Sequence, residues 1–264
     1  MDLIRLENVS KAFGNKKVIN DISYNFEAGK IYGIVGTNGC GKSVLFKLIS
    51  GLMKASYGKI VVGKTVVGKN GAMPEDLGLL IEHPGFLPNL TGFENLDQLA
   101  AIKNKITKAD IEEILKEVSL YQDKDVRVKN YSLGMLQRLG IDQALMEKPK
   151  LLLLDEPFNS MDYEGVVELR EIIKSYVRNK GVTMLITSHD KEDIEILSDQ
   201  VLVLKNGKLK ESKDWEKTQS FLLKIISDFL WNTYSLYIIH IYIILFKVCF
   251  YVCELNFIKI FNML

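Results

Sequence analysis

The sequence predicts an α/β fold built around a buried parallel sheet. Three continuous apolar runs, at residues 31–35, 151–155 and 182–187, have the length and composition of strands that are covered on both faces. The first run leads into a glycine-rich loop and then into a helix-like apolar stretch that ends at Gly51. With 264 residues, the chain is long enough for one such domain with an inserted lobe.

The glycine-rich loop predicts phosphate binding. Residues 36–43 read Gly-Thr-Asn-Gly-Cys-Gly-Lys-Ser and match the pattern G-x-x-x-x-G-K-S/T, between a strand and a helix as this motif requires. Successive backbone N–H groups surround a phosphate in such a loop, and the helix dipole adds to the attraction. We expect Lys42 to reach the β- and γ-phosphates of ATP and Ser43 to bind Mg²⁺. The predicted nucleotide contacts are Gly36, Thr37, Asn38, Gly39, Cys40, Gly41, Lys42, Ser43 and Val44.

A second motif predicts hydrolysis of the bound nucleotide. Four leucines at residues 151–154 are followed by Asp155, Glu156 and Pro157. Because ligands of open α/β sheets bind at the carboxyl ends of the strands, we expect both acids to lie beside the glycine loop. Asp155 is predicted to support the Mg²⁺ site, partly through water, and Glu156 to act as the base toward the attacking water. A helix N-cap is the structural alternative for the two acids.

The run Tyr-Ser-Leu-Gly-Met-Leu-Gln-Arg-Leu at residues 131–139 resembles the signature motif of ABC-type ATPases, LSGGQ. Leu133 replaces its first glycine and Met135 its glutamine. The resemblance, which covers about residues 1–210, implies a P-loop NTPase fold of the ABC ATPase type, with an antiparallel β lobe and an inserted helical lobe. It also implies that Ser132 and Gly134 face the γ-phosphate of ATP held by a second ATPase subunit, in a dimer.

Three further positions carry a role only through this resemblance. Residues 159–162 look like the D-loop, which contacts the partner subunit, and residues 187–190 look like the switch-histidine loop. His189 would then contact the γ-phosphate and help to hold the attacking water. Phe13 stands where the family has an aromatic ring that stacks on adenine. Ordinary packing roles are the alternatives for His189 and Phe13.

Glu82 departs from the common family pattern, which has a glutamine linking the Mg²⁺ site to the membrane subunit. Residues 79–96 resemble instead the "E-loop" version found in ABC ATPases for bacitracin resistance and lantibiotic self-protection. We therefore expect Glu82 to lie near Mg²⁺ and to couple ATP to the membrane subunit, with a solvated loop acid as the alternative. Thr91 and Glu94 also predict a capping box at the start of a helix.

Charge and cysteines narrow the class of protein. The net charge of +1 gives no sign of a nucleic-acid surface. Cys40 lies within the glycine loop, where a disulfide is incompatible with phosphate binding, and residues 1–10 do not resemble a secretory signal. These features predict a reducing, cytosolic setting. Cys40 is interpreted as a small spacer, with redox sensing as the alternative, and Cys249 and Cys253 as packing residues.

The chain divides into an ATPase domain at residues 1–214 and a hydrophobic tail at residues 215–264. Short strands are predicted at residues 3–9, 22–26 and 58–67, a helical lobe at about 83–148, a helix at 162–180, and a hairpin at 201–209 with an Asn-Gly turn. The tail is apolar over residues 229–251, yet Asn232, His240 and Lys247 interrupt it. A membrane helix, a docking helix and an unselected extension all remain open for it.

Together these features predict an ATP-hydrolysing subunit of an ABC transporter, bound peripherally to the cytoplasmic face of the membrane. A second copy of the chain and a separate multi-span permease are the expected partners, and resistance to a peptide antibiotic is the expected output. A non-transport ABC ATPase and a non-hydrolysing nucleotide switch are the alternatives. One doubtful span is too few for a transporter that carries its own membrane pathway.

Overall fold

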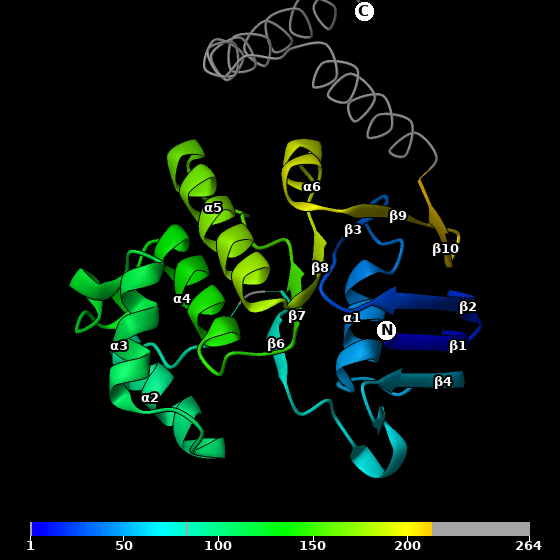
Figure 1. Cartoon of the computed structure of the whole chain (residues 1–264), viewed down its shortest axis with the longest axis horizontal. Coiled ribbons are helices and arrows are strands. Elements are labelled where there is room, and N and C mark those ends of the chain that lie inside the picture. Colours follow the sequence, from blue (N-terminus) through cyan, green and yellow to red (C-terminus); the bar gives the residue numbers. More distant parts are fainter. Residues whose placement is uncertain (1, 83, 213–264) are drawn as a thin grey trace, which may run out of the picture. The chain divides into compact units, whose positions relative to one another are not determined.

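The computed structural model describes residues 2–82 and 84–212, which contain two β-sheets (Figure 1). The central sheet has six strands in the order β10-β9-β3-β8-β7-β6. All neighbours pair in parallel except β10 and β9, which form an antiparallel hairpin. The strands are β3 (Ile31–Val35), β6 (Leu77–Leu80), β7 (Leu151–Asp155), β8 (Thr183–Thr187), β9 (Gln200–Lys205) and β10 (Lys208–Glu211).

The parallel strands place four loops at one edge of the sheet. The glycine loop follows β3, the two acids follow β7, the His189 loop follows β8, and Glu82 follows β6. Because β3, β8, β7 and β6 are consecutive neighbours, their carboxyl ends bring these loops side by side. The strand order therefore assembles the candidate site.

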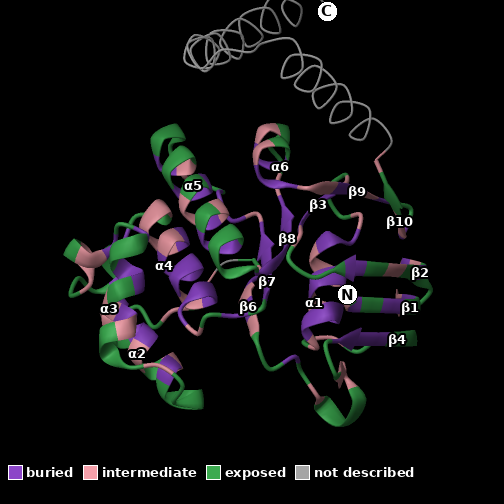
Figure 2. Ribbon diagram, viewed as in Figure 1, coloured by how far each residue is buried: buried purple, intermediate pink, exposed green. Residues whose placement is uncertain are grey.

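A second sheet covers the first helix. It has the order β2-β1-β4-β5 and consists of β1 (Asp2–Phe13), β2 (Lys16–Glu27), β4 (Tyr57–Val62) and β5 (Thr65–Val66). Helix α1 (Lys42–Ser50) contacts β7 on one side and β2 and β4 on the other, so it lies between the two sheets (Figure 1). The apolar side chains of both sheets and α1 form one core, whose residues are among those coloured purple as buried in Figure 2.

The remaining helices begin and end at residues that suit them. Helix α5 (Tyr163–Lys180) starts at the N-cap Asp162 and ends at Gly181, which has a left-handed conformation. Thr91 and Glu94 form the predicted capping box of α2 (Gly92–Lys103). Helices α2, α3 (Lys108–Glu117) and α4 (Leu133–Leu145) lie between residues 83 and 148, and α6 (Lys191–Leu197) follows the His189 loop.

Several predicted elements are confirmed and others need correction. The hairpin turn at Asn206 and Gly207 is confirmed, with a positive φ at both residues. The first two strands are longer than predicted, because β1 and β2 pair along most of their length. The single strand predicted at 58–67 is two strands, β4 and β5, because the chain turns at Gly63, where φ is 56°. Strand β6 and helix α6 were not predicted, since short elements carry little periodic signal.

The boundary at residue 214 and the whole predicted tail, with Cys249 and Cys253, lie outside the described residues. Across residues 2–82 and 84–212, no helix combines the length and the apolar composition needed to cross a bilayer.

One buried carboxyl group in α4 has no ion partner within residues 2–82 and 84–212. Asp142 is fully buried, and neither of its carboxyl oxygens has a hydrogen-bond partner among the described residues. Burial raises the pKa of Asp142 well above its usual range, the charge of Glu117 adds to the effect, and Arg138 opposes it. The folded state therefore keeps this proton at pH values at which the unfolded chain releases it.

We predict that Asp142 makes the folded state less stable as pH rises. Between the unfolded pKa of about 4 and the higher folded pKa, the folded state binds more protons, so the free energy of unfolding falls by up to about 1.4 kcal/mol per pH unit. Asp142→Asn should remove this slope and be more stable than the wild type at pH 8, with the difference shrinking toward pH 4. Urea unfolding across this pH range measures it, with exposed Asp125→Asn as the control. Parallel slopes for wild type and Asp142→Asn would contradict the assignment.

Candidate active site

The glycine loop leaves backbone donors free at the start of α1. Gly39 has φ of 72° and Gly41 has φ of 112°, and the N–H of Cys40 donates to the carbonyl of Thr37 at 3.1 Å. Gly41 is the N-cap of α1, so no side chain caps the first turn. The first N–H groups of a helix need an acceptor, and the positive end of the helix dipole favours an anion. The loop is therefore shaped for a phosphate.

Two glycines of the motif are also required by packing. A Cβ atom on Gly36 would lie 2.4 Å from the carbonyl oxygen of Leu204 in β9. One on Gly41 would lie 2.9 Å from a methyl group of Val18 in β2, and its φ already disfavours other residues. The loop is thus held against strands of both sheets.

Lys42 is the buried cation of the site. Its side chain is only 7% exposed, and its Nζ atom donates to the carbonyl of Gly36 at 2.9 Å. The amine therefore lies across the glycine loop, at the face where a phosphate would bind. A phosphate bound there would replace this carbonyl as the acceptor of the Lys42 hydrogen bond, and it would carry a full negative charge.

Asp155 and Glu156 are fixed by a threonine on the neighbouring strand. Asp155 pairs with Thr187 in the register of β7 and β8, and the Thr187 hydroxyl donates to Asp155 Oδ1 at 2.6 Å. The backbone N–H of Glu156 donates to that hydroxyl at 3.0 Å and to the Thr187 carbonyl at 3.2 Å. Glu156 itself has φ of 53°, an uncommon conformation for a glutamate. The two acids are therefore held in separate directions at the end of β7.

The carboxylate of Glu156 lies against His189. The backbone N–H of His189 donates to Glu156 Oε2 at 2.9 Å. The ring atom Nε2 is 3.2 Å from Oε1, but it is not aligned for a hydrogen bond, and buried Oε1 has no hydrogen-bond partner among the described residues. This oxygen is left to accept a proton from a small molecule such as water.

Burial also makes Glu156 more basic. Loss of hydration raises the pKa of Glu156, and the positive charges of His189 and Lys42 and the hydrogen bond from the His189 backbone oppose this rise. A nearby negative charge on Asp155 acts in the same direction as burial. A carboxylate with a raised pKa is a better base near neutral pH.

The donor set at this edge fits Mg²⁺ bound together with phosphates. Ser43 lies in the first turn of α1, Asp155 lies at the end of β7, and α1 packs on β7. No cluster of three or more histidine, cysteine, aspartate or glutamate side chains is present within residues 2–82 and 84–212. Mg²⁺ commonly takes one or two carboxylates, phosphate oxygens and water, so one acid and one hydroxyl suit it.

The run at residues 131–139 begins α4, and this helix contacts the backbone of Glu156 in the same chain. Ser132 is the N-cap of α4, accepts from the Met135 N–H at 3.1 Å, and is exposed. Leu133, the replacement for a glycine, is 60% exposed. Farther along α4, the Gln137 side chain donates to the carbonyl of Glu156 at 3.2 Å. The start of the run thus faces outward while its helix touches the acids of the same chain.

Phe13 and Glu82 lie on the surface. Phe13, at the end of β1, is 48% exposed, with the Lys11 amine 5.2 Å from its ring centre. Glu82 follows β6, has φ of 61°, and forms an ion pair with Lys47 of α1 at 2.5 Å. Both positions are open to a ligand or partner, and the roles predicted for them stay predictions.

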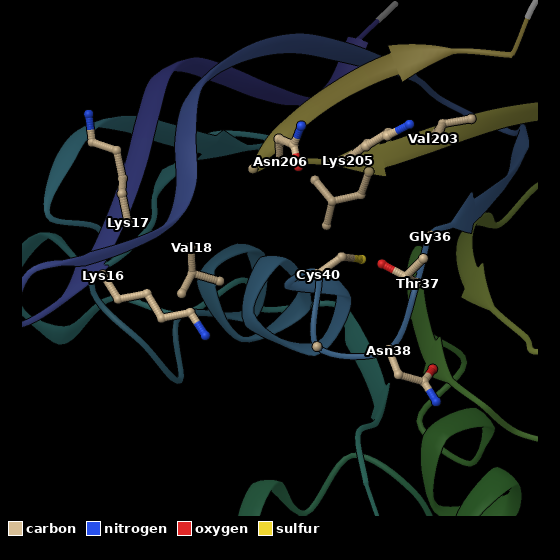
Figure 3. Close-up of a pocket in the computed structure, with 13 residues that line it drawn as sticks. Lys16, Lys17, Val18, Gly36, Thr37, Asn38, Cys40, Val203, Lys205 and Asn206 are labelled. Atoms are coloured by element: carbon tan, nitrogen blue, oxygen red, sulfur yellow. The ribbon is translucent and has the colours of Figure 1, made fainter.

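A cavity of about 420 Å³ opens on the other side of the glycine loop (Figure 3). Neither Lys42 nor Glu156 lines it, so it does not mark the hydrolytic centre. In Figure 3 the Cys40 sulfur points along the loop toward Thr37 and Gly36. The lining residues are Lys16, Lys17, Val18, Gly36, Thr37, Asn38, Gly39, Cys40, Val203, Leu204, Lys205, Asn206 and Gly207.

The structure therefore brings Lys42, Asp155, Glu156 and His189 to one edge of the sheet, and the roles predicted for them stay predictions. No hydrogen bond joins Ser132 to this group in the part of the chain that the structure describes. Sequence reasoning gave no role to Thr187 or Gln137. A polar residue at the end of an otherwise apolar strand is the signal that points to Thr187.

Comparison with known proteins identifies the family. The family model described as ABC transporter matches residues 19–159. The chain belongs to the ABC transporter family. It is 38% identical over 210 residues to the bacitracin transport ATP-binding protein BcrA of Enterococcus faecalis, which covers 79% of this chain and 68% of that protein. It is 33% identical to the lantibiotic transport ATP-binding protein SrtF of Streptococcus pyogenes, over 83% of this chain and 93% of that one.

Solved structures agree with the fold. A dimeric ATP-binding cassette in a post-hydrolysis state, bound to ADP and phosphate, gives a TM-score of 0.72 at 22% identity, covering 80% of this chain and 98% of that one. An ATP-binding subunit of an ABC transporter gives 0.72 at 25% identity, over 83% and 93% of the two chains. This ABC protein is thus the ATP-binding, ATP-hydrolysing subunit of a transporter, of a type that acts as a dimer with a membrane permease.

Proposed function

We propose that two copies of this chain close head-to-tail around two ATP molecules and drive a separate permease that removes a peptide antibiotic. Membership of the ABC transporter family accounts for the ATPase activity. The proposal adds the role of each residue, the second copy and the cargo.

The proposed hydrolytic step rests on Glu156. Its buried Oε1 atom has no hydrogen-bond partner in the described residues, and burial raises the pKa of its carboxyl group. Glu156 takes the proton from the attacking water, His189 helps to hold that water, and Lys42 balances charge on the β- and γ-phosphates. When bound to Ser43 and Asp155, Mg²⁺ supplies further charge neutralisation at the phosphates.

The geometry of α4 supports a site shared between copies. The N-cap Ser132 and the following Gly134 begin this helix and stay clear of the site of their own chain, while Gln137 contacts Glu156 from inside. The positive end of α4 is therefore presented outward, where a second copy can offer its γ-phosphate. Phe13 is half exposed at the end of β1, so one face of its ring is free to stack on adenine in the proposed complex.

The peptide cargo is inferred from Glu82 and the relatives. Bacitracin and lantibiotic transport proteins are among the relatives at 33–38% identity. Glu82 follows β6 at the same sheet edge as Asp155, and it links to α1 through Lys47. An acid there responds to changes at the Mg²⁺ and phosphate site, and it lies on an exposed loop where a permease can contact it. Docking on the permease would hold the subunit at the cytoplasmic face of the membrane.

The function is tested in cells. We expect a susceptible bacterium that expresses this chain together with its permease to tolerate several-fold more bacitracin or lantibiotic. The Glu156→Gln variant serves as the inactive control at matched expression. Unchanged susceptibility with an active ATPase would overturn the peptide cargo and leave the ATPase assignment intact.

We predict that Glu82 matters more for transport than for hydrolysis. Glu82→Ala should remove most of the several-fold gain in resistance in such cells, while the isolated subunit keeps ATP turnover within about threefold. Glu82→Gln, nearly isosteric, should retain part of the resistance and change the Mg²⁺ dependence of turnover modestly. Exposed Glu75→Gln, in the segment that precedes β6, is the matched control. If neither Glu82 variant changed resistance or Mg²⁺ dependence, Glu82 would be an ordinary surface acid.

A further inference from the structure

A buried arginine joins α5 to the helix that follows the His189 loop. Arg170 is 3% exposed, and its guanidinium group contacts two acids of α6. The Nε atom donates to Asp193 Oδ1 at 2.6 Å, Nη2 lies 2.5 Å from the same oxygen, and Nη1 donates to Glu192 Oε1 at 3.1 Å. Asp193 is itself 2% exposed, so this pair is held in a site from which water is nearly excluded.

The second oxygen of Asp193 continues the chain of contacts into the loop. Asp193 Oδ2 accepts a hydrogen bond from the Ser188 hydroxyl. The Ser188 oxygen in turn accepts from the backbone N–H of Asp190 at 3.0 Å, and Asp190 caps α6 by accepting from Glu192 N–H at 2.9 Å. The loop is thus tied to Arg170 through a single carboxylate.

His189 lies between two anchors. On one side Thr187 is bonded to Asp155 and to the Glu156 backbone. On the other side Ser188 is bonded to Asp193. The backbone N–H of His189, between them, donates to Glu156 Oε2 at 2.9 Å. A shift of the Ser188 anchor therefore moves the donor that orients Glu156.

We propose that Arg170 is a positioning residue for hydrolysis, which through Asp193 and Ser188 fixes the backbone of His189 against Glu156. The inference rests on the proposed roles of Glu156 and His189. Arg170 also belongs to α5, which begins directly after residues 159–162, the loop that faces a second copy in the proposed dimer. The same contacts therefore connect the dimer-facing loop to the His189 loop.

Stability alone does not explain this arrangement. Apolar side chains of similar volume stabilise a core as well as a buried ion pair does, because removing charges from water is costly. A buried arginine with a forked contact fixes direction, which apolar contacts do not. Arg178, on the same helix, is a useful comparison with Arg170. It pairs with Asp199, but its side chain is 44% exposed and, among the described residues, does not contact the His189 loop.

The first test replaces the forked guanidinium group of Arg170 with an amine and keeps the positive charge. Arg170→Lys should lower kcat for ATP at least about tenfold and leave KM within about twofold, because ATP contacts other residues. Arg178→Lys, the matched control, should leave both constants unchanged. A purely structural role for Arg170 predicts instead a lower melting temperature with unchanged kcat, and that result would overturn the proposal.

The second test removes the hydrogen bond from Ser188 to Asp193 and keeps the ion pair between Arg170 and Asp193. Ser188→Ala therefore tests the same path in a variant that should still fold if the arginine variant does not. It should lower kcat to a similar degree and speed hydrogen exchange in residues 187–192, measured by mass spectrometry. Because both substitutions break one path, Arg170→Lys with Ser188→Ala should cost little more than either alone.

The outcomes separate this inference from the proposed function. If Glu156→Gln loses turnover while Ser188→Ala and Arg170→Lys keep wild-type kcat, the positioning role is wrong and the base assignment stands. If Glu156→Gln keeps full turnover, the base assignment fails and the inference fails with it. Fully additive losses in the double variant would also contradict a shared path.

Discussion

Replacing Glu156 with glutamine is expected to slow ATP hydrolysis by about 10²–10⁴-fold, the usual worth of a general base. Glutamine keeps the shape of the side chain, and its oxygen can still accept from the His189 N–H, but it cannot take a proton from water. ATP binding should persist, because the phosphate contacts lie in the glycine loop. Single-turnover hydrolysis and calorimetric binding measure the two quantities separately.

The same variant reports on the dimer. Without hydrolysis, two copies with ATP should remain closed, so size-exclusion chromatography with Mg²⁺ and ATP should show a dimer that ADP does not support. Exposed Glu195→Gln, on α6, is the control and should behave as the wild type in both experiments. Unchanged turnover in Glu156→Gln would assign the base elsewhere, and a monomer with bound ATP would contradict the shared site.

Replacing Lys42 with alanine is expected to remove most of the affinity for ATP. The lysine provides a buried cation in the loop, where its charge acts through few water molecules. The present partner of its amine is the Gly36 carbonyl, so the substitution leaves no buried charge unpaired and the fold should be retained. Calorimetric titration with Mg²⁺ and ATP measures the loss.

Thermal unfolding gives an independent readout of the Lys42 variant. At a ligand concentration about 100 times Kd, binding stabilises the folded state by about 2.7 kcal/mol, which raises the melting temperature of the wild type. Lys42→Ala should show almost none of this rise, whereas exposed Lys64→Ala, in the turn between β4 and β5, should show all of it. A normal rise in Lys42→Ala would contradict the phosphate-binding assignment.

Much of the site was predictable because its residues occur in short, continuous runs. The spacing of Gly36 to Ser43, the apolar strand before Asp155 and Glu156, and the segment around His189 each carry their chemistry within a few residues. Local signals also fixed several element ends: Asp162 and Gly181 bound α5 as predicted, and Thr91 with Glu94 caps α2. Such features depend on neighbours in the chain, so sequence alone reports them.

Other features depend on partners far apart in the sequence. Gln137 reaches the carbonyl of Glu156, and Thr187 holds Asp155 across the strand pair. Arg170 lies beside the apolar residues Leu169 and Ile173 on the buried face of α5. A charged residue at a position with apolar neighbours on a buried face indicates a buried partner of opposite charge. Nothing local identifies the partner as Asp193, because the pairing is set by how α5 packs on α6.

The sequence by itself determined the chemistry of this protein: a phosphate loop, two acids after a buried strand, a histidine loop and the family they indicate. The tertiary structure decided which of these groups act together. The order β3-β8-β7-β6 places their loops at one edge of the sheet. Folding also buries Glu156 Oε1 without a hydrogen-bond partner among the described residues, and it links the His189 loop to Arg170 through Ser188 and Asp193. The physical reason is that strand order, burial and hydrogen-bond pairing arise from contacts between distant segments, and only the folded chain brings these segments together.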